Sequence, residues 1–227
     1  EVKSLVKTLE TLSYFSIDLE TTGINSLNTE IVGISISHDK DITDKKAANF
    51  KIYYVAVGHE LEDDPIKNLN RNEVLEIFKP LLENEAILKI GHNIKYEINV
   101  FSNYGIELKG IQDDTFIADY ILNPANAHGL KEIAGTHLRY AMTPITELIG
   151  SGKNAITMNK VLTEKSAIYA GADSAVTLEL SFYLREQMEK VGLTKLYEEI
   201  ELPLIPVLAR MEQAGIKIDE KQLRALS

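Results

Sequence analysis

Tyr14-Phe15-Ser16-Ile17-Asp18-Leu19-Glu20-Thr21-Thr22-Gly23 joins an alternating apolar run to two closely spaced carboxylates. The run over 14–18 predicts a β-strand, with the carboxylates where that strand is expected to end. Side chains two apart in a strand share a face, so we expect Asp18 and Glu20 side by side, about 7 Å apart. Such a pair favours two divalent cations, which serve phosphate-ester chemistry. An isolated Asp-x-Glu is more often a solvated acidic turn, so the interpretation depends on further motifs.

The composition narrows the class of protein. The chain has 227 residues, of which 44% are hydrophobic, enough for one core or one core with a small appendage. It has no cysteine, no glycosylation sequon, no apolar run of membrane-spanning length and no signal-peptide pattern. We therefore expect a soluble protein of a reducing compartment without a membrane partner. The net charge of −10 argues against gripping a long nucleic-acid duplex but allows a short, metal-mediated contact.

A second cluster stands at Gly91-His92-Asn93-Ile94-Lys95-Tyr96-Glu97, where a short strand is expected to pass into a helix. If Asn93 begins that helix, Asn93 and Glu97 are four apart and share a face. Junctions of this kind collect at the ligand-binding edge of an α/β sheet. The alternative is that Asn93 is an N-cap and Glu97 an exposed acid of the first turn.

A third cluster is Tyr169-Ala170-Gly171-Ala172-Asp173, in the helical part of the chain. Tyr169 and Asp173 are also four apart, so a phenol and a carboxylate can meet at one site. A phenol with an ordinary pKa near 10 is a poor base, so its expected task is to orient a metal-bound water. The alternative is a core tyrosine beside a capping or ion-paired aspartate. The stretch 150–154 is predicted to be a mobile loop, because Glu147 and Asn154 break the phosphate-loop pattern.

The hydrophobic periodicity predicts an α/β fold. Short or polar connections, including 39–49, join the first three strands, which favours an antiparallel meander. The predicted strands are 14–18, 30–37, 51–57 and 86–90. The predicted helices are 72–82, 94–103, 115–122, 130–138, 161–170, 172–191 and 196–211. We expect a mixed sheet flanked by helices, and an RNase H-like sheet of this kind could bring the three clusters together.

Taken together, the clusters resemble the 3′–5′ proofreading exonuclease domain of family A, bacterial DNA polymerase I-like, DNA polymerases. The resemblance covers nearly the whole chain and includes 81–83, 91–96, 103–108, 114–115, 120–123 and 173–180. Residues 199–219 resemble the segment that opens the polymerase domain in that family. The expected division is therefore an RNase H-like exonuclease domain over 1–192 and a helical connection with the start of a truncated polymerase domain over 193–227. The alternative for the end is an ordinary helix capped by Gly215.

The resemblance also implies roles for individual residues. The residues implied to bind two Mg²⁺ or Mn²⁺ ions directly are Asp18, Glu20 and Asp173. Glu97 is implied to act through water. Tyr169 is implied to orient the attacking hydroxide. Residues implied to contact the substrate are Thr21 and Asn93 at the terminal nucleotide, and Ile24 and Tyr96 at the 3′ base. No role falls to His92 or His128.

One position departs from the family pattern. The second motif of the family normally ends in Asp, and here it ends in Glu97. The extra methylene moves the carboxylate by about 1 Å or more, and catalytic geometry tolerates little of that. The second metal is therefore expected to bind more weakly, with Asp114 as the neighbouring candidate if Glu97 takes no part.

The expected activity is removal of mononucleotides from single-stranded or frayed 3′ DNA ends by a two-metal mechanism. The expected partner is the polymerase domain of the same longer chain, in a bacterial cytoplasm or nucleoid or in a DNA-containing organelle. Two alternatives remain open. One is an inactive exonuclease fold that serves as a scaffold, which Glu97 favours. The other is an RNase D-like exoribonuclease.

Overall fold

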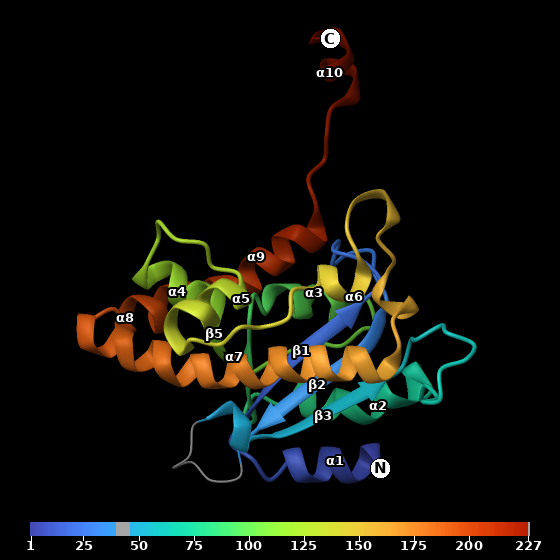
Figure 1. Ribbon diagram of the computed structural model, residues 1–227. Coiled ribbons are helices and arrows are strands. Elements are labelled where there is room, and N and C mark those ends of the chain that lie inside the picture. The colour runs from blue at the N-terminus through green and yellow to red at the C-terminus, as the bar shows by residue number, and fades with distance from the viewer. Residues whose placement is uncertain (40–45, 227) are drawn as a thin grey trace.

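The computed structural model describes residues 1–39 and 46–226, so the predicted connection over 39–49 lies partly outside the described residues. Within these ranges a five-stranded sheet has the order β3-β2-β1-β4-β5 (Figure 1). Its strands are β1 (Tyr14–Thr21), β2 (Ile31–His38), β3 (Lys51–Ala56), β4 (Leu88–Gly91) and β5 (Ile111–Asp114). β1, β2 and β3 pair antiparallel, and β4 pairs parallel with β1 and β5. The predicted meander within a mixed sheet is confirmed.

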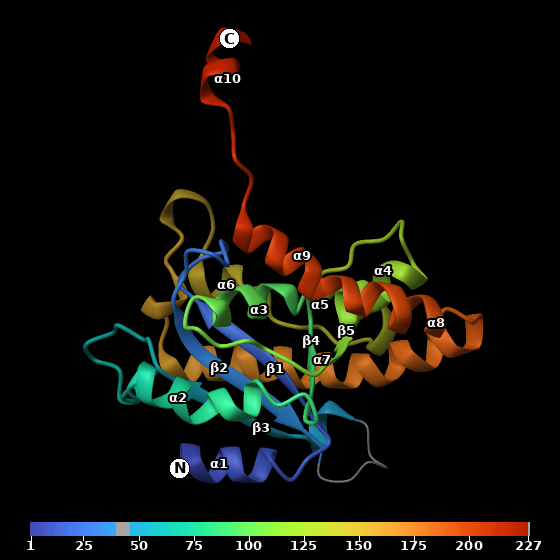
Figure 2. The same ribbon diagram turned by 180° about the vertical axis from the view of Figure 1, so that it is seen from behind.

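Helices cover both faces of the sheet. One face carries α7 (Thr163–Val191), and the other carries α2 (Arg71–Leu82) and α3 (Lys95–Ser102), with α1 (Val2–Leu9) beside α2 (Figures 1 and 2). The remaining helices are α4 (Thr115–Leu122), α5 (Leu130–Ile133), α6 (Thr146–Ile149), α8 (Thr194–Leu196), α9 (Leu202–Ala214) and α10 (Glu220–Leu226). No helix of the described residues is long and apolar enough to cross a membrane.

β1 separates an apolar face of the sheet from a polar one. Its buried apolar side chains, Phe15, Ile17 and Leu19, join one core with α1, α2 and α3. Because side chains alternate along a strand, Asp18 and Glu20 face the side that α7 covers. On β2, the register partner of Asp18 is Ser35, whose hydroxyl donates to the carbonyl of Ala170 on α7 at 2.9 Å. This small side chain lets the helix lie close to the carboxylate-bearing strand.

α7 runs unbroken through Gly171, where the sequence predicted one helix over 161–170 and another over 172–191. The prediction was wrong because this glycine serves packing and not a turn. A Cβ at Gly171 would lie 2.9 Å from Cγ2 of Ile52 on β3, so only glycine allows this approach of helix to sheet. The continuous helix places Tyr169 and Asp173 on one rigid element.

Four further elements differ from the prediction. β1 continues to Thr21, so Asp18 and Glu20 lie inside a strand and not at its end. α1 was not predicted, although its buried residues Leu5, Val6 and Leu9 have helical spacing. β5 was not predicted because Gln112, Asp113 and Asp114 give it a polar, loop-like composition. The predicted helix over 130–138 is α-helical to residue 133 and continues as a π turn.

The segment after α7 folds back on the sheet. Gly192, with a φ of 75°, ends α7, and Tyr197 is completely buried. α9 then lies against α3, where Glu212 accepts a hydrogen bond from Asn99 at 2.7 Å and pairs with Lys95. Beyond Ala214 the chain extends into solvent, and α10 stands away from the sheet (Figures 1 and 2). The domain boundary at residue 192 stays a prediction. α9 lies beyond that boundary but packs against α3, which lies before it.

Candidate active site

Three buried carboxylates lie around Asp18, two of them on the α7 side of β1 and one on α3. Glu20 comes from β1 itself, Glu97 from α3 and Asp173 from α7. Desolvation and then the charge of Asp173 raise the pKa of Asp18 to about 7. Burial, with the charges of Asp18 and Asp173 added, raises the pKa of Glu20 well above its usual value. Carboxylates that oppose each other's ionisation in this way favour the binding of a cation or a proton.

Glu97 reaches this cluster from the first turn of α3. It is only 4% exposed, and its Oε2 has no hydrogen-bond partner among the described residues. Burial and then the charge of Asp18 raise its pKa, whereas a hydrogen bond with the backbone of Leu19 opposes that shift. A buried carboxylate oxygen without a partner is costly, so this atom calls for a cation, a proton or a water.

The turn before α3 has a different geometry from the predicted one. Asn93 has a φ of 59°, in the left-handed region, and α3 begins after it at Lys95. The prediction that Asn93 and Glu97 share a helix face is therefore wrong, and so is the alternative that Asn93 caps the helix. The side chain of Asn93 is exposed at the edge of the site.

Asp114 holds this turn in place. Its carboxylate accepts hydrogen bonds from the backbone nitrogens of Asn93 at 3.0 Å and Ile94 at 2.9 Å. It also caps α4 by accepting from the backbone nitrogens of Phe116 at 2.9 Å and Ile117 at 3.3 Å. Four backbone donors give Asp114 a structural task, which disfavours it as the substitute for Glu97.

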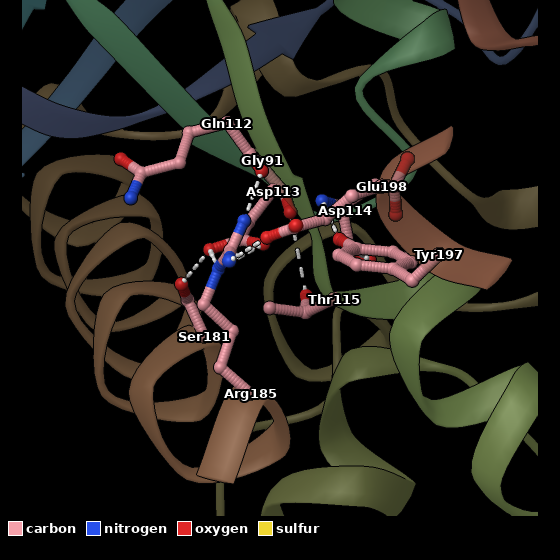
Figure 3. Close-up of polar contacts among 9 residues, drawn as sticks. All are labelled: Gly91, Gln112, Asp113, Asp114, Thr115, Ser181, Arg185, Tyr197 and Glu198. Atoms are coloured by element: carbon pink, nitrogen blue, oxygen red, sulfur yellow. Dashed lines mark hydrogen bonds and ion pairs between the residues drawn. The ribbon is translucent and has the colours of Figure 1, made fainter. Parts of the chain in front are cut away.

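A second polar network lies behind Asp114 (Figure 3). Its neighbour Asp113 accepts from Nε of Arg185 at 2.6 Å and from Ser181 at 2.5 Å, both on α7. Arg185 also pairs with Glu198 at 2.7 Å (Figure 3). The network fastens β5, α7 and the segment after α7 to one another, so it supports the site without belonging to the carboxylate cluster.

Tyr169 and Asp173 meet one turn apart on α7, as their spacing suggested. Burial raises the pKa of Asp173, and the charge of Lys131, its hydrogen bond and the hydrogen bond from the phenol of Tyr169 oppose this shift. Burial raises the pKa of the phenol above its ordinary value, and the charges of Asp173, Glu20 and Asp18 add to this. Tyr169 is therefore a neutral hydrogen-bond donor at physiological pH and not a base.

Lys131 is the residue that the sequence analysis missed. It projects from α5, its Nζ pairs with Oδ1 of Asp173, and the same nitrogen lies 4.2 Å from the centroid of the Tyr169 ring. Sequence spacing carries no signal for it, because Lys131 and Asp173 are 42 residues apart and meet only through the packing of α5 on α7.

The predicted nucleotide-contacting residues fall into two groups. Thr21 and Tyr96 are joined, with Oγ1 of Thr21 at 2.5 Å from Oη of Tyr96, and Tyr96 donates to the carbonyl of Gly23 at 2.6 Å. Ile24 is 99% exposed and, like Asn93, has its side chain free for a ligand. The structure thus links Thr21 to Tyr96 near Glu20 and leaves the other two at the surface.

The two histidines near the site have other partners. Nδ1 of His92 lies 2.9 Å from the hydroxyl of Thr115, and Nδ1 of His128 lies 2.6 Å from Oδ2 of Asp119. Burial lowers the pKa of His92 to about 4, so it is neutral at physiological pH.

The donor set suits a hard divalent cation. In the present arrangement, no three Asp, Glu or His side chains of the described residues converge closely enough to hold a metal ion. The cluster nevertheless consists of carboxylate oxygens, which Mg²⁺ and Mn²⁺ prefer. The unpartnered Oε2 of Glu97 and the ammonium group on Asp173 both mark a place for positive charge. These residues fit a carboxylate-bound cation, with Lys131 engaging one of the oxygens that would hold it.

Comparison with known sequences gives consistent matches. A family model described as 3′–5′ exonuclease matches residues 1–189. DNA polymerase I of Rhizobium leguminosarum is 34% identical over 221 residues, which cover 92% of this chain and 21% of that protein. DNA polymerase I of Chloroflexus aurantiacus is 35% identical over 225 residues, covering 98% of this chain and 22% of that protein. The chain thus spans about a fifth of the length of these curated relatives.

Solved structures share the fold. The POL domain of Pol1 from M. smegmatis, in complex with DNA primer-template and dNTP, has a TM-score of 0.73 at 18% identity, covering 100% of this chain and 33% of that one. Escherichia coli RNase D has a TM-score of 0.66 at 15% identity, and the match covers 92% of this chain and 48% of that one. Brucella melitensis NrnC with bound Mg²⁺ has a TM-score of 0.64 at 20% identity, covering 90% and 87%. These neighbours confirm the RNase H-like class of the fold.

Proposed function

Because the chain belongs to the 3′–5′ exonuclease family of DNA polymerase I, we propose that it proofreads for a longer polymerase by removing mononucleotides from single-stranded or frayed 3′ DNA ends. The observation that carries this proposal is the carboxylate cluster on the α7 side of β1, with the phenol of Tyr169 beside it. The relatives named DNA polymerase I favour DNA as the substrate over RNA.

The carboxylates are the proposed metal ligands. Asp18, Glu20 and Asp173 would hold two Mg²⁺ or Mn²⁺ ions directly, and Glu97 would act through water. When bound, such a pair of cations supplies activation of the attacking water and stabilisation of the leaving 3′ oxygen. The protein contributes a rigid frame, because two ligands lie on a paired strand and one on a long helix.

Tyr169 is the proposed orienting donor for the attacking water. Its phenol stays protonated, so it can hold a water or hydroxide by donating a hydrogen bond but cannot remove a proton. The proposed contacts with the terminal nucleotide come from Thr21 and Asn93. The exposed side chain of Ile24 and the ring of Tyr96 are proposed to contact the 3′ base.

The burial of the site favours an unpaired end as substrate. Glu20, Glu97 and Asp173 are all buried beneath the surface of the domain. A scissile phosphate reaches such a depth only if the terminal nucleotide leaves its partner strand, and mispaired ends fray most easily. The net charge of −10 agrees with a short contact at the strand end and not with a long grip on duplex.

The same proposal covers the arrangement within a longer chain. Residues 1–192 form the exonuclease domain, and 193–227 form the helical connection and the start of a polymerase domain. The buried Tyr197 and the packing of α9 on α3 support a firm junction between the two. The proposed location is the cytoplasm or nucleoid of a bacterium, or a DNA-containing organelle.

A direct test compares four 5′-labelled substrates: single-stranded DNA, the same sequence as RNA, a DNA duplex with a mispaired 3′ end, and the fully paired duplex. Each is incubated with Mg²⁺ or Mn²⁺, with excess chelator, and with the Asp18→Asn variant. We expect ladders shortened from the 3′ end for single-stranded and mispaired DNA, and loss of digestion in chelator. Asp18→Asn should lower the rate by more than about 100-fold, since even groups that only support metal ligands are worth 10–100-fold.

Each other result rejects a specific part of the proposal. Faster digestion of RNA than of DNA would favour the RNase D-like alternative. No digestion of any substrate at saturating metal would favour the inactive scaffold. Undiminished digestion in chelator, or by Asp18→Asn, would show that the site is misassigned.

A further inference from the structure

Lys131 places a positive charge inside the carboxylate cluster. Its Nζ pairs with Oδ1 of Asp173 and lies against the ring of Tyr169, so it contacts both of the site residues that α7 contributes. Its side chain is 24% exposed, and the side chain of Asp173 is 12% exposed, so the pair is largely shielded from solvent. The ammonium is therefore part of the site and not a solvated surface charge.

The position of Lys131 is fixed by packing. It lies on α5 between Leu130 and Ile133, which are buried in a cluster with Val176 and Leu180 of α7. The backbone that carries the ammonium is thus held on the same helix that carries Asp173. Because its backbone is anchored in this way, we expect the ammonium to contact Oδ1 of Asp173 whenever no other cation occupies that oxygen.

The charge of Lys131 reaches beyond Asp173. It also acts favourably on the ionised forms of Asp18 and Glu20, which otherwise repel Asp173 and each other. A divalent cation held by these carboxylates would neutralise the same charges and would draw on the carboxylate of Asp173 that the ammonium now contacts. An ammonium and a divalent cation repel each other when both lie against the carboxylate of Asp173, so a bound metal weakens the Lys131–Asp173 pair and the pair weakens metal binding.

We propose that Lys131 is the built-in counter-cation of this site: it neutralises Asp173 while no metal is bound and gives up the Asp173 oxygen when a divalent cation enters. This inference rests on the proposed function, because it takes Asp18, Glu20 and Asp173 as the metal ligands. Lys131 is then a positioning residue. It holds the carboxylate of Asp173 in place, and it makes metal binding weaker than the carboxylates alone would allow.

The test measures metal binding without turnover. Mn²⁺ is titrated calorimetrically into the protein in the absence of DNA, for the wild type, Lys131→Met, Lys131→Gln and Lys131→Arg. The control is Lys190→Met, which removes the same charge from an exposed lysine of α7 that pairs only with the exposed Glu186 among the described contacts. The melting temperature of each protein is recorded in chelator and in saturating Mn²⁺.

We expect Lys131→Met and Lys131→Gln to bind Mn²⁺ about tenfold more tightly than the wild type, because a competing cation is gone. In chelator both should melt at a lower temperature than the wild type, and Mn²⁺ should raise their melting temperature by more than it raises that of the wild type. Lys131→Arg keeps the charge and should stay near the wild type, and Lys190→Met should match the wild type in both measurements.

Two results would overturn the inference. Equal Mn²⁺ affinity in Lys131→Met and Lys190→Met would show that the ammonium does not compete at the site. Weaker Mn²⁺ binding in both Lys131→Met and Lys131→Gln would show that the lysine orients Asp173 for the metal instead of competing for it. A failure of the proposed function is distinguishable, because then Asp18→Asn would bind Mn²⁺ as the wild type does.

Discussion

The hydroxyl of Tyr197 lies 2.8 Å from the backbone nitrogen of Asp114, and both residues are buried (Figure 3). The same hydroxyl lies 3.2 Å from the carbonyl oxygen of Asp114. Since the carboxylate of Asp114 holds the turn that leads into α3, this one phenol connects the segment after α7 to the helix that carries Glu97. Removal of the hydroxyl oxygen of Tyr197 should therefore weaken this connection.

Tyr197→Phe should destabilise the protein. The ring still fills its cavity, but the N–H of Asp114 loses its partner inside the protein, which costs about 1–3 kcal/mol. The free energy of unfolding in urea measures this loss. Tyr120→Phe is the matched control, because Tyr120 is 52% exposed and should change stability by less than about 0.5 kcal/mol. Equal stability of the two variants would mean that the bond to Asp114 has no net value.

Tyr169→Phe separates turnover from binding. The variant keeps the ring that packs near Lys131 and loses only the donor hydroxyl, so turnover should fall by about one to three powers of ten. Affinity for single-stranded DNA, measured by fluorescence anisotropy in Ca²⁺, should stay within about twofold, since the hydroxyl faces the carboxylates and not the strand. Unchanged turnover would show that Tyr169 is a core residue without a part in the reaction.

Asn93→Ala provides the opposite case. Its side chain is exposed at the edge of the site and is proposed to contact the terminal nucleotide. Anisotropy should therefore show weaker binding as the main effect. The left-handed φ of 59° makes Asn93→Gly the better control for the backbone, because glycine adopts this conformation without strain. A loss of turnover alone, with binding intact in both variants, would contradict the assigned contact.

Glu97→Asp tests the departure from the family pattern. Oε2 of Glu97 is buried without a partner, and the side chain is one methylene longer than the Asp of the family pattern. Shortening the side chain should raise the activity or lower the metal concentration for half-maximal rate, whereas Glu97→Ala should reduce activity sharply. Rates at limiting Mn²⁺ give the comparison. If all three proteins digest DNA equally, Glu97 has no part in the reaction.

The buried Lys89 predicts a pH dependence of stability. Burial lowers its pKa from 10.5 to about 8, and Nζ still donates to the carbonyl of Asn84 at 2.7 Å. Between those two pKa values the unfolded chain binds more protons than the folded one, so stability must rise with pH from about 8 to about 10.5. Across that pH range, the free energy of unfolding of the wild type, measured in urea, should rise by roughly 1–3 kcal/mol relative to that of Lys89→Met. A constant difference between the two proteins would show that Lys89 is not desolvated.

Most of the sheet could be predicted from the sequence because its signals are local. Alternating apolar residues mark β1, β2 and β3, and the short connections between them set their antiparallel order. The i, i+2 spacing of Asp18 and Glu20 and the i, i+4 spacing of Tyr169 and Asp173 likewise translate directly into shared faces. Each of these relations depends only on the geometry of one element.

The errors fall where a tertiary partner overrides the local pattern. Gly171 looks like a break but accommodates Ile52. β5 looks like a loop because it is polar, and its partners come from distant segments: Arg185 pairs with the carboxylate of Asp113, and the Tyr197 hydroxyl accepts from the backbone N–H of Asp114. Asn93 takes a left-handed turn that the carboxylate of Asp114 stabilises from 21 residues away. Lys131 could not be found for the same reason: its partner is set by the docking of α5 on α7.

The contact between α9 and α3 has a mechanical consequence. Glu212 pairs with Lys95 and accepts a hydrogen bond from Asn99. These two residues are one turn apart on the side of α3 away from Glu97. α3 is thus held on one side by α9, and it carries Glu97 on the opposite side. A displacement of α9 would therefore be passed to Glu97 through α3. Since a shift of about 1 Å changes the geometry of a carboxylate site, we expect strain on α9 to alter the activity proposed for this site.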